Sequence, residues 1–109
     1  MYTDWTRAQE ELKSGVTLLM FKTDWCNDCK MIQLMLDEEL KKWSSEGISN
    51  FKVTYVNAED SGLFRKETGD YPVPKIPSFF VVKDGKPEHL GIKFVPMELI
   101  KSKIVEALK

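Results

Sequence analysis

The strongest constraint on the fold is a change of hydrophobic period near residue 22. Residues 16–21 form an almost unbroken apolar run, as expected of a central strand that is covered on both faces. From position 26 onward the apolar residues recur at helical spacing instead, and Gly47 ends the pattern. The members of this stripe are Cys29, Ile32, Leu36, Leu40 and Trp43. A buried strand that leads into a helix is typical of an α/β fold.

Periodicity and turn residues predict the remaining elements. They are a helix at 3–14, a strand at 51–56, a short helix at 60–69, a strand at 78–82, a return strand after 87 and a helix that has Pro96 at its first position. The dipeptide Asp84-Gly85 suits a tight hairpin turn, so the strands beside it should be antiparallel. Strands 16–21 and 51–56 are joined through a helix and should be parallel. We therefore expect an α/β three-layer sandwich, with a mixed sheet of about four strands and helices on both faces.

The size of the chain fits one compact domain, which we assign to residues 1–109. With 42% hydrophobic and 30% charged residues, the chain can bury a core and remain well solvated. The side chains that we assign to packing rather than to ligand binding are Trp5, Met20, Met31, Met35, Trp43, Phe79 and Phe80.

Charge and hydropathy exclude several kinds of partner. The formal net charge is -1 and the basic residues are not clustered, which argues against nucleic-acid binding. The first residues are polar and lack the order of a secretory signal peptide. The longest apolar run is far too short to cross a bilayer. We expect a cytoplasmic monomer that binds neither nucleic acid nor membrane.

The only two cysteines, Cys26 and Cys29, are three positions apart. A bridge between them would close a very small loop and restrict the unfolded chain little, so reactivity explains the pair better than stability does. Cys26 falls at the tip of the predicted helix, where unpaired N–H groups and the helix dipole favour a thiolate. We expect Cys26 to be the exposed nucleophile and Cys29, one turn on, to be the buried resolving thiol.

At these residues the chain resembles the thioredoxin family. Residues 25–30 resemble the family's Trp-Cys-Gly-Pro-Cys-Lys active site, and residues 71–78 resemble its Tyr-Gly-Val-Arg-Gly-Ile-Pro-Thr segment. Residues 82–86 and the later Gly91 resemble its hairpin and the glycine that follows. The resemblance runs from about residue 16 to the C-terminus. The family's usual first strand is missing, which is why we expect four strands instead of five.

The resemblance implies a site and an activity. Pro77 would be a cis proline beside the cysteine pair. The backbone of Ile76 would pair with an extended substrate segment, and Trp25 would line the rim of that groove. The implied activity is that of a thiol–disulfide oxidoreductase, a protein-disulfide reductase that works by dithiol–disulfide exchange without cofactor or metal. Its partners would be disulfide-containing proteins and an electron donor, either a reductase or a small thiol.

Three positions depart from the family's pattern. Met20 stands where the family has a buried aspartate that assists proton transfer at the resolving thiol. The lysine that partners this aspartate falls near Tyr55, and Lys22 occupies a position usually held by tryptophan. Without the carboxylate, Cys29 must lose its proton to water or to another group. Lys22 is interpreted either as a nearby positive charge or as a solvated residue at the strand end.

The residues between and before the cysteines set an expectation for the redox potential. Asn27-Asp28 replaces the family's Gly-Pro, and Asp24 adds a second carboxylate near Cys26. Negative charge opposes the helix dipole and should raise the pKa of Cys26. A less stabilised thiolate favours the disulfide form, so we expect a reducing protein.

Three alternatives remain open at this point. The first is a redox-silent module that holds an extended peptide in the cis-proline groove, with Trp25 at its rim. The second is a dedicated oxidase or isomerase, which would differ only in potential. The third is a zinc site, in which His89 and carboxylates would have to join the two thiolates or two chains would have to share a cluster.

Overall fold

The sheet is built around its most apolar strand. The computed structural model describes all of residues 1–109 and has the elements α1 (Trp5–Glu11), β1 (Val16–Lys22), α2 (Asn27–Ser45), β2 (Lys52–Asn57), β3 (Ser78–Lys83), β4 (Lys86–Ile92) and α3 (Met97–Ala107). The strand order is β2-β1-β3-β4; β1 runs parallel to β2, and the other two pairs are antiparallel. All seven residues of β1 are buried. The continuous apolar run therefore marks an inner strand, as predicted.

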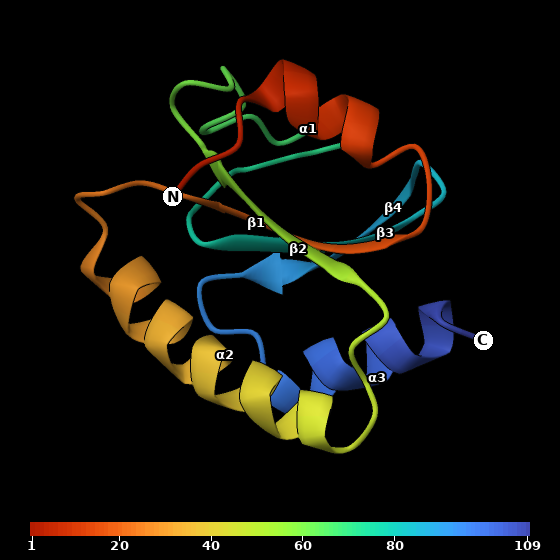
Figure 1. Cartoon of the computed structure of the whole chain (residues 1–109). Helices are drawn as coiled ribbons and strands as arrows, with labels where there is room; N and C mark the ends of the chain where they lie inside the picture. The colour runs from red at the N-terminus through yellow and green to blue at the C-terminus, as the bar shows by residue number, and fades with distance from the viewer.

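Helices cover both faces of this sheet (Figure 1). The short helix α1 lies on one face, and α2 and α3 lie on the other. The expected α/β three-layer sandwich with a mixed four-stranded sheet is therefore confirmed. None of the three helices has the length and apolarity needed to cross a membrane.

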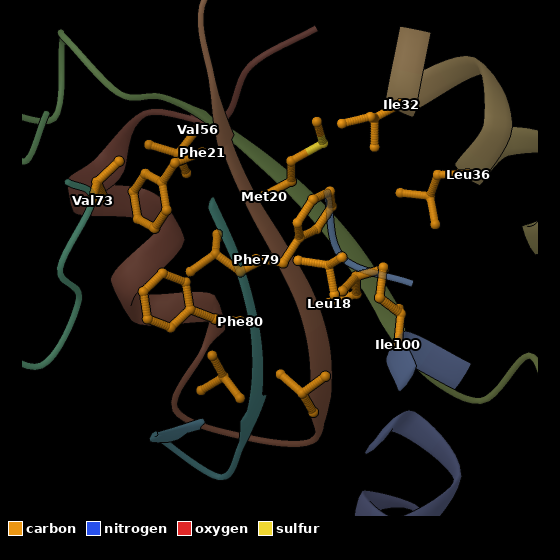
Figure 2. Packing of buried hydrophobic residues seen from close by; sticks show 14 of the residues in the cluster. Leu18, Met20, Phe21, Ile32, Leu36, Val56, Val73, Phe79, Phe80 and Ile100 are labelled. Carbon is orange, nitrogen blue, oxygen red and sulfur yellow. The ribbon is translucent and has the colours of Figure 1, made fainter. Parts of the chain in front are cut away.

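The alternation of side chains along the strands divides the core into two parts (Figure 2). On the side of α2 and α3, Met20 of β1 lies near Ile32 of α2 and Leu18 lies near Ile100 of α3. All four residues are fully or almost fully buried. On the side of α1, the ring of Phe21 packs edge-on against Phe80 with centroids 5.7 Å apart. Fully burying one such side chain contributes roughly 1.5–3 kcal/mol.

An aromatic cluster fixes α1 and the loop before β3 to the sheet. The Trp5 ring lies 5.3 Å from Phe21 and 5.1 Å from Tyr71, both edge-on. The Asp4 side chain caps α1 by accepting the N–H groups of Thr6 and Arg7. A seven-residue helix is marginal by itself, so these contacts hold it in place.

Two expectations about local structure are wrong. Residues 60–69 contain turns and no helix, because Gly62 and Arg65 adopt left-handed φ angles of 77° and 71° that end any helical turn. A parallel bridge joins Phe64 to Val73 in that region instead. Pro96 is the N-cap of α3 and not its first helical residue.

The two methionines of α2 assigned to packing are exposed. Met31 is 56% exposed and Met35 is 49% exposed, whereas Met20 is fully buried as expected. The apolar stripe of α2 faces the sheet, and positions 31 and 35 lie on a different side of the helix. The packing role predicted for Trp43, Phe79 and Phe80 is confirmed.

Candidate active site

The cysteine pair lies at the start of α2, just after the central strand β1 ends. Lys22 and Thr23 are buried, Asp24 and Trp25 form an exposed turn, and Cys26 is the N-cap of the helix. The Cys29 N–H donates to the Cys26 Sγ over 3.1 Å. The sulfur therefore satisfies one of the donors that every helix N-terminus leaves free.

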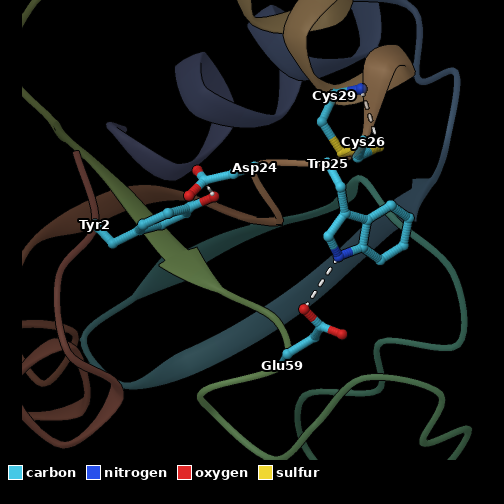
Figure 3. Close-up of a disulfide and its surroundings, with 6 residues drawn as sticks. All are labelled: Tyr2, Asp24, Trp25, Cys26, Cys29 and Glu59. Carbon is cyan, nitrogen blue, oxygen red and sulfur yellow. Dashed lines mark hydrogen bonds between the residues drawn. A yellow bond between two sulfur atoms is a disulfide. The ribbon is translucent and has the colours of Figure 1, made fainter.

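The two sulfurs are joined in a disulfide, with the Cα atoms 5.2 Å apart (Figure 3). Cys26 keeps 7% of its surface exposed, and Cys29 keeps none. The exposed fraction of Cys26 is smaller than the sequence suggested, but it faces a groove in the surface. Of the two sulfur-bearing residues, Cys26 is thus the one that an incoming group can reach.

A groove of about 540 Å³ opens beside Cys26. Trp25 and Asn27 line one part of it, and Pro74 and Ile76 of the cis-proline loop line another. The Ile76–Pro77 peptide bond is cis, as the resemblance implied. Pro77 itself does not line the groove. The N–H and C=O of Ile76 make no hydrogen bond within the chain, so both are available to a bound segment.

Trp25 forms the rim of the groove. Its side chain is 58% exposed, and its indole Nε1 donates to a Glu59 carboxylate oxygen over 3.1 Å (Figure 3). Its ring also lies 6.0 Å from that of Phe64. Sequence reasoning missed Glu59. The parallel arrangement of the two strands was the signal that could have identified it. Lys22 at the end of β1 pairs with Asn57 at the end of β2, which brings the residues after β2 close to the residues after β1.

Lys22 is not a solvated residue at the strand end. Its side chain is buried, and its Nζ lies 4.5 Å from the centre of the Tyr2 ring and 5.6 Å from that of Tyr55. Aromatic faces stabilise a cation that has little water around it. Lys22 forms no ion pair. The buried acid–lysine pair of the family that the chain resembles is thus absent: Met20 is apolar and buried, and Lys22 contacts two aromatic rings.

The two tyrosines around Lys22 stay neutral at ordinary pH. Burial raises the pKa of Tyr2 to about 12, helped by the hydrogen bond that its hydroxyl donates to Asp24 over 2.9 Å. Burial also raises the pKa of Tyr55 to about 12, with a smaller contribution from Asp37. Their rings therefore face Lys22 in the uncharged form.

His89 lies in β4, and its side chain contacts two residues of the neighbouring strand β3. Its ring stacks on Phe80 at 4.4 Å, and its Nε2 shares a 2.8 Å hydrogen bond with the Ser78 hydroxyl. The residue is exposed overall, and partial burial of its ring lowers the pKa of His89, against a smaller opposite effect of a hydrogen bond with the Gly91 backbone. No group of three or more His, Cys, Asp or Glu side chains is placed to hold a metal ion.

Comparison with known protein families shows which family the chain belongs to. The thioredoxin model matches residues 3–106. The chain belongs to the thioredoxin family. Thioredoxin from Mycoplasmopsis pulmonis is 34% identical over 106 residues, which cover 96% of this chain and 95% of the relative. Thioredoxin from Bacillus subtilis is 30% identical over 90 residues, which cover 83% and 80%. The match includes α1, although the resemblance was visible only from about residue 16.

Solved thioredoxin structures have the same fold. A mutant thioredoxin from Halobacterium salinarum superposes with a TM-score of 0.74 at 16% identity, over 99% of this chain and 88% of that one. The oxidised mitochondrial thioredoxin 3 of Saccharomyces cerevisiae gives a TM-score of 0.67 at 21% identity, over 93% and 88%. Family membership together with the Cys26–Cys29 pair makes this protein a thiol–disulfide oxidoreductase of the disulfide-reductase type.

Proposed function

We propose that Cys26 is the attacking thiol and Cys29 the resolving thiol of a protein-disulfide reductase. The observation that carries this assignment is the position of the Cys26 sulfur, which caps α2 and faces the groove, while Cys29 is fully buried one turn behind. A backbone N–H that donates to a sulfur favours its thiolate form. Cys29 can reach only Cys26, so it suits the second step.

The proposed reaction transfers two electrons and two protons to the substrate. The Cys26 thiolate attacks one sulfur of a substrate disulfide and forms a mixed disulfide, and the other substrate sulfur leaves and takes up a proton. Cys29 then loses its proton and attacks the Cys26 sulfur. This step closes the Cys26–Cys29 disulfide and releases the second substrate thiol. An external donor, a reductase or a small thiol, returns the electrons.

The groove beside Cys26 is proposed to hold an extended segment of the substrate. The free N–H and C=O of Ile76 support this role, because an added β-type segment needs such unpaired backbone groups. Trp25, held by Glu59, would bound the segment at the rim. Pro77 would act by shaping the loop, since it does not itself face the groove.

A proposal about partners and compartment is supported by the relatives. We propose that the protein acts as a single-domain monomer on disulfide-containing proteins in the cytoplasm and is recycled there. The thioredoxins of two bacteria that cover most of the chain support this proposal. A reducing potential is proposed with it, because the Asp28 carboxylate in the first turn of α2 disfavours the Cys26 thiolate. Arg65, Lys75 and Lys93 line the same groove and act in the opposite direction. A strongly oxidising value in a glutathione redox titration would contradict this part.

Insulin reduction driven by dithiothreitol tests the assignment. We expect the wild-type protein to accelerate insulin precipitation well beyond the dithiothreitol background. Cys26→Ser should remove this acceleration, because no attacking thiol remains. A wild-type rate equal to the background would refute the reductase and leave the redox-silent peptide-binding module as the better account of the groove.

A further inference from the structure

The groove beside Cys26 carries an excess of positive charge. Three of its ten lining residues are cations, namely Arg65, Lys75 and Lys93, and one is a carboxylate, Asp28. The chain as a whole has a formal net charge of -1, so the excess is local and does not reflect composition. Glu59 accepts a hydrogen bond from Trp25 at the rim but does not line the groove.

None of the three cations is neutralised within the protein. All three side chains are exposed, and none takes part in any of the six ion pairs. None makes a side-chain hydrogen bond. The Arg65 guanidinium lies 5.3 Å from the centre of the Phe64 ring, which leaves its N–H edges free. Such an edge fits a carboxylate with two parallel hydrogen bonds.

The backbone holds two of these cations at the groove in an unfavourable conformation. Arg65 has a φ of 71° and Lys93 a φ of 60°, and the third non-glycine residue of this kind, Asp84, lies in the β3–β4 turn. A left-handed φ costs conformational energy for such residues and persists only where neighbouring contacts impose it. The contacts here are with the cis-proline loop: the Arg65 N–H donates to Val73 and the Lys93 N–H to Pro77, each over 2.7 Å.

The three cations are thus organised around one loop. Lys75 lies on the loop itself, immediately before Ile76, whose backbone groups are free. Arg65 and Lys93 are tied to the loop from two other segments of the chain. A peptide that pairs with Ile76 next to Cys26 would therefore pass between positive side chains.

We propose that this groove selects disulfide substrates in which aspartate or glutamate flanks the reacting cysteine. The inference rests on the proposed function, because it concerns the segment that Cys26 attacks. The free backbone of Ile76 favours an extended peptide as the occupant, and the unpaired cations favour acidic side chains on that peptide. Complementary charge of this kind raises the association rate and discriminates against basic segments.

The test uses three synthetic peptides that each contain one disulfide and differ only in the flanking residues, which are Glu, Gln or Lys. The rate constant for reduction by the reduced protein is measured for each peptide and divided by its rate constant with dithiothreitol. This division removes the effect of the flanking charge on the intrinsic reactivity of the disulfide. We expect an acidic-to-neutral ratio of about tenfold at low salt, which falls towards one in about 0.5 M salt.

Two triple variants localise the effect. Arg65→Gln, Lys75→Gln and Lys93→Gln together should bring the acidic-to-neutral ratio close to one. Lys83→Gln, Lys86→Gln and Lys109→Gln remove the same charge from exposed positions outside the groove and should leave the ratio unchanged.

The outcomes separate this inference from the function on which it rests. If the wild-type protein reduces none of the three peptides, the reductase itself is refuted. If the neutral peptide is reduced but the acidic one has no advantage, the acidic preference is refuted and the reductase stands. The same holds if the advantage survives in the groove variant or is lost in the control variant.

Discussion

The reactivity of Cys26 depends on a small number of local charges and dipoles. Its sulfur accepts the Cys29 N–H at the start of α2, which favours the thiolate of the reduced protein. Asp28 lies in the first turn of the same helix and lines the same groove, which opposes the thiolate. The groove cations Arg65, Lys75 and Lys93 act in the same direction as the N–H and favour the thiolate. The balance between these effects and that of Asp28 sets how strongly the protein reduces its substrates.

Removal of the Asp28 charge should shift this balance in a defined direction. In Asp28→Asn we expect a lower pKa of the Cys26 thiol and a less negative reduction potential, because the thiolate loses a repulsive neighbour. The pH dependence of thiolate absorbance and a glutathione titration measure the two quantities. Glu38→Gln removes a charge from an exposed position further along α2 and should change neither. An unchanged or raised pKa in Asp28→Asn would contradict the argument.

His89 gives the protein a pH-dependent stability. Burial holds its pKa below the ordinary 6.5, so the unfolded chain binds a proton at a higher pH than the folded protein does. The contribution of His89 to stability is therefore fully present above pH 6.5 and is lost as the pH falls through its folded pKa. We expect the free energy of unfolding to drop more between about pH 7 and pH 5 in the wild type than in His89→Gln. Chemical denaturation measures both slopes, and equal slopes would refute the role of His89.

Among the elements, those with a regular hydrophobic period could be predicted from the sequence. The buried run of β1 and the stripe of α2 both appear where expected. A strand buried on both faces has a continuous apolar sequence, and a helix buried on one face has apolar residues at helical spacing. The segment at 60–69 could not be predicted. Its structure depends on the left-handed Arg65 and on a bridge between Phe64 and Val73, and neither leaves a periodic signal.

The short helix α1 depends on its cap. The Asp4 side chain accepts two N–H groups that would otherwise be free, so Asp4→Ala should lower the free energy of unfolding by about 1 kcal/mol. Asp4→Asn keeps an acceptor at this position and should lose much less. Denaturation of the three proteins at neutral pH measures the difference. If the alanine and asparagine variants are equally stable, the cap does not contribute.

For the molecule as a whole, the site is assembled from segments that are distant in sequence. The cysteine pair and the cis proline could be located from motifs, but their surroundings could not. The burial of Lys22 depends on Tyr2, whose ring lies against it. Tyr2 is held near the sheet because the N–H of the next residue, Thr3, donates to the Tyr55 carbonyl. The contact of Trp25 with Glu59 depends on the register of β1 and β2. Such contacts are set by tertiary structure and carry no local sequence pattern.

The central claim is that Cys26 attacks and Cys29 resolves, and trapping of the mixed disulfide tests it most directly. Reduced Cys29→Ser and Cys26→Ser proteins are each mixed with a disulfide peptide, and adducts are located by mass spectrometry after digestion. We expect Cys29→Ser to accumulate a stable adduct at Cys26, and Cys26→Ser to form almost none because Cys29 is buried. An adduct that forms at Cys29 as fast as at Cys26 would contradict the account.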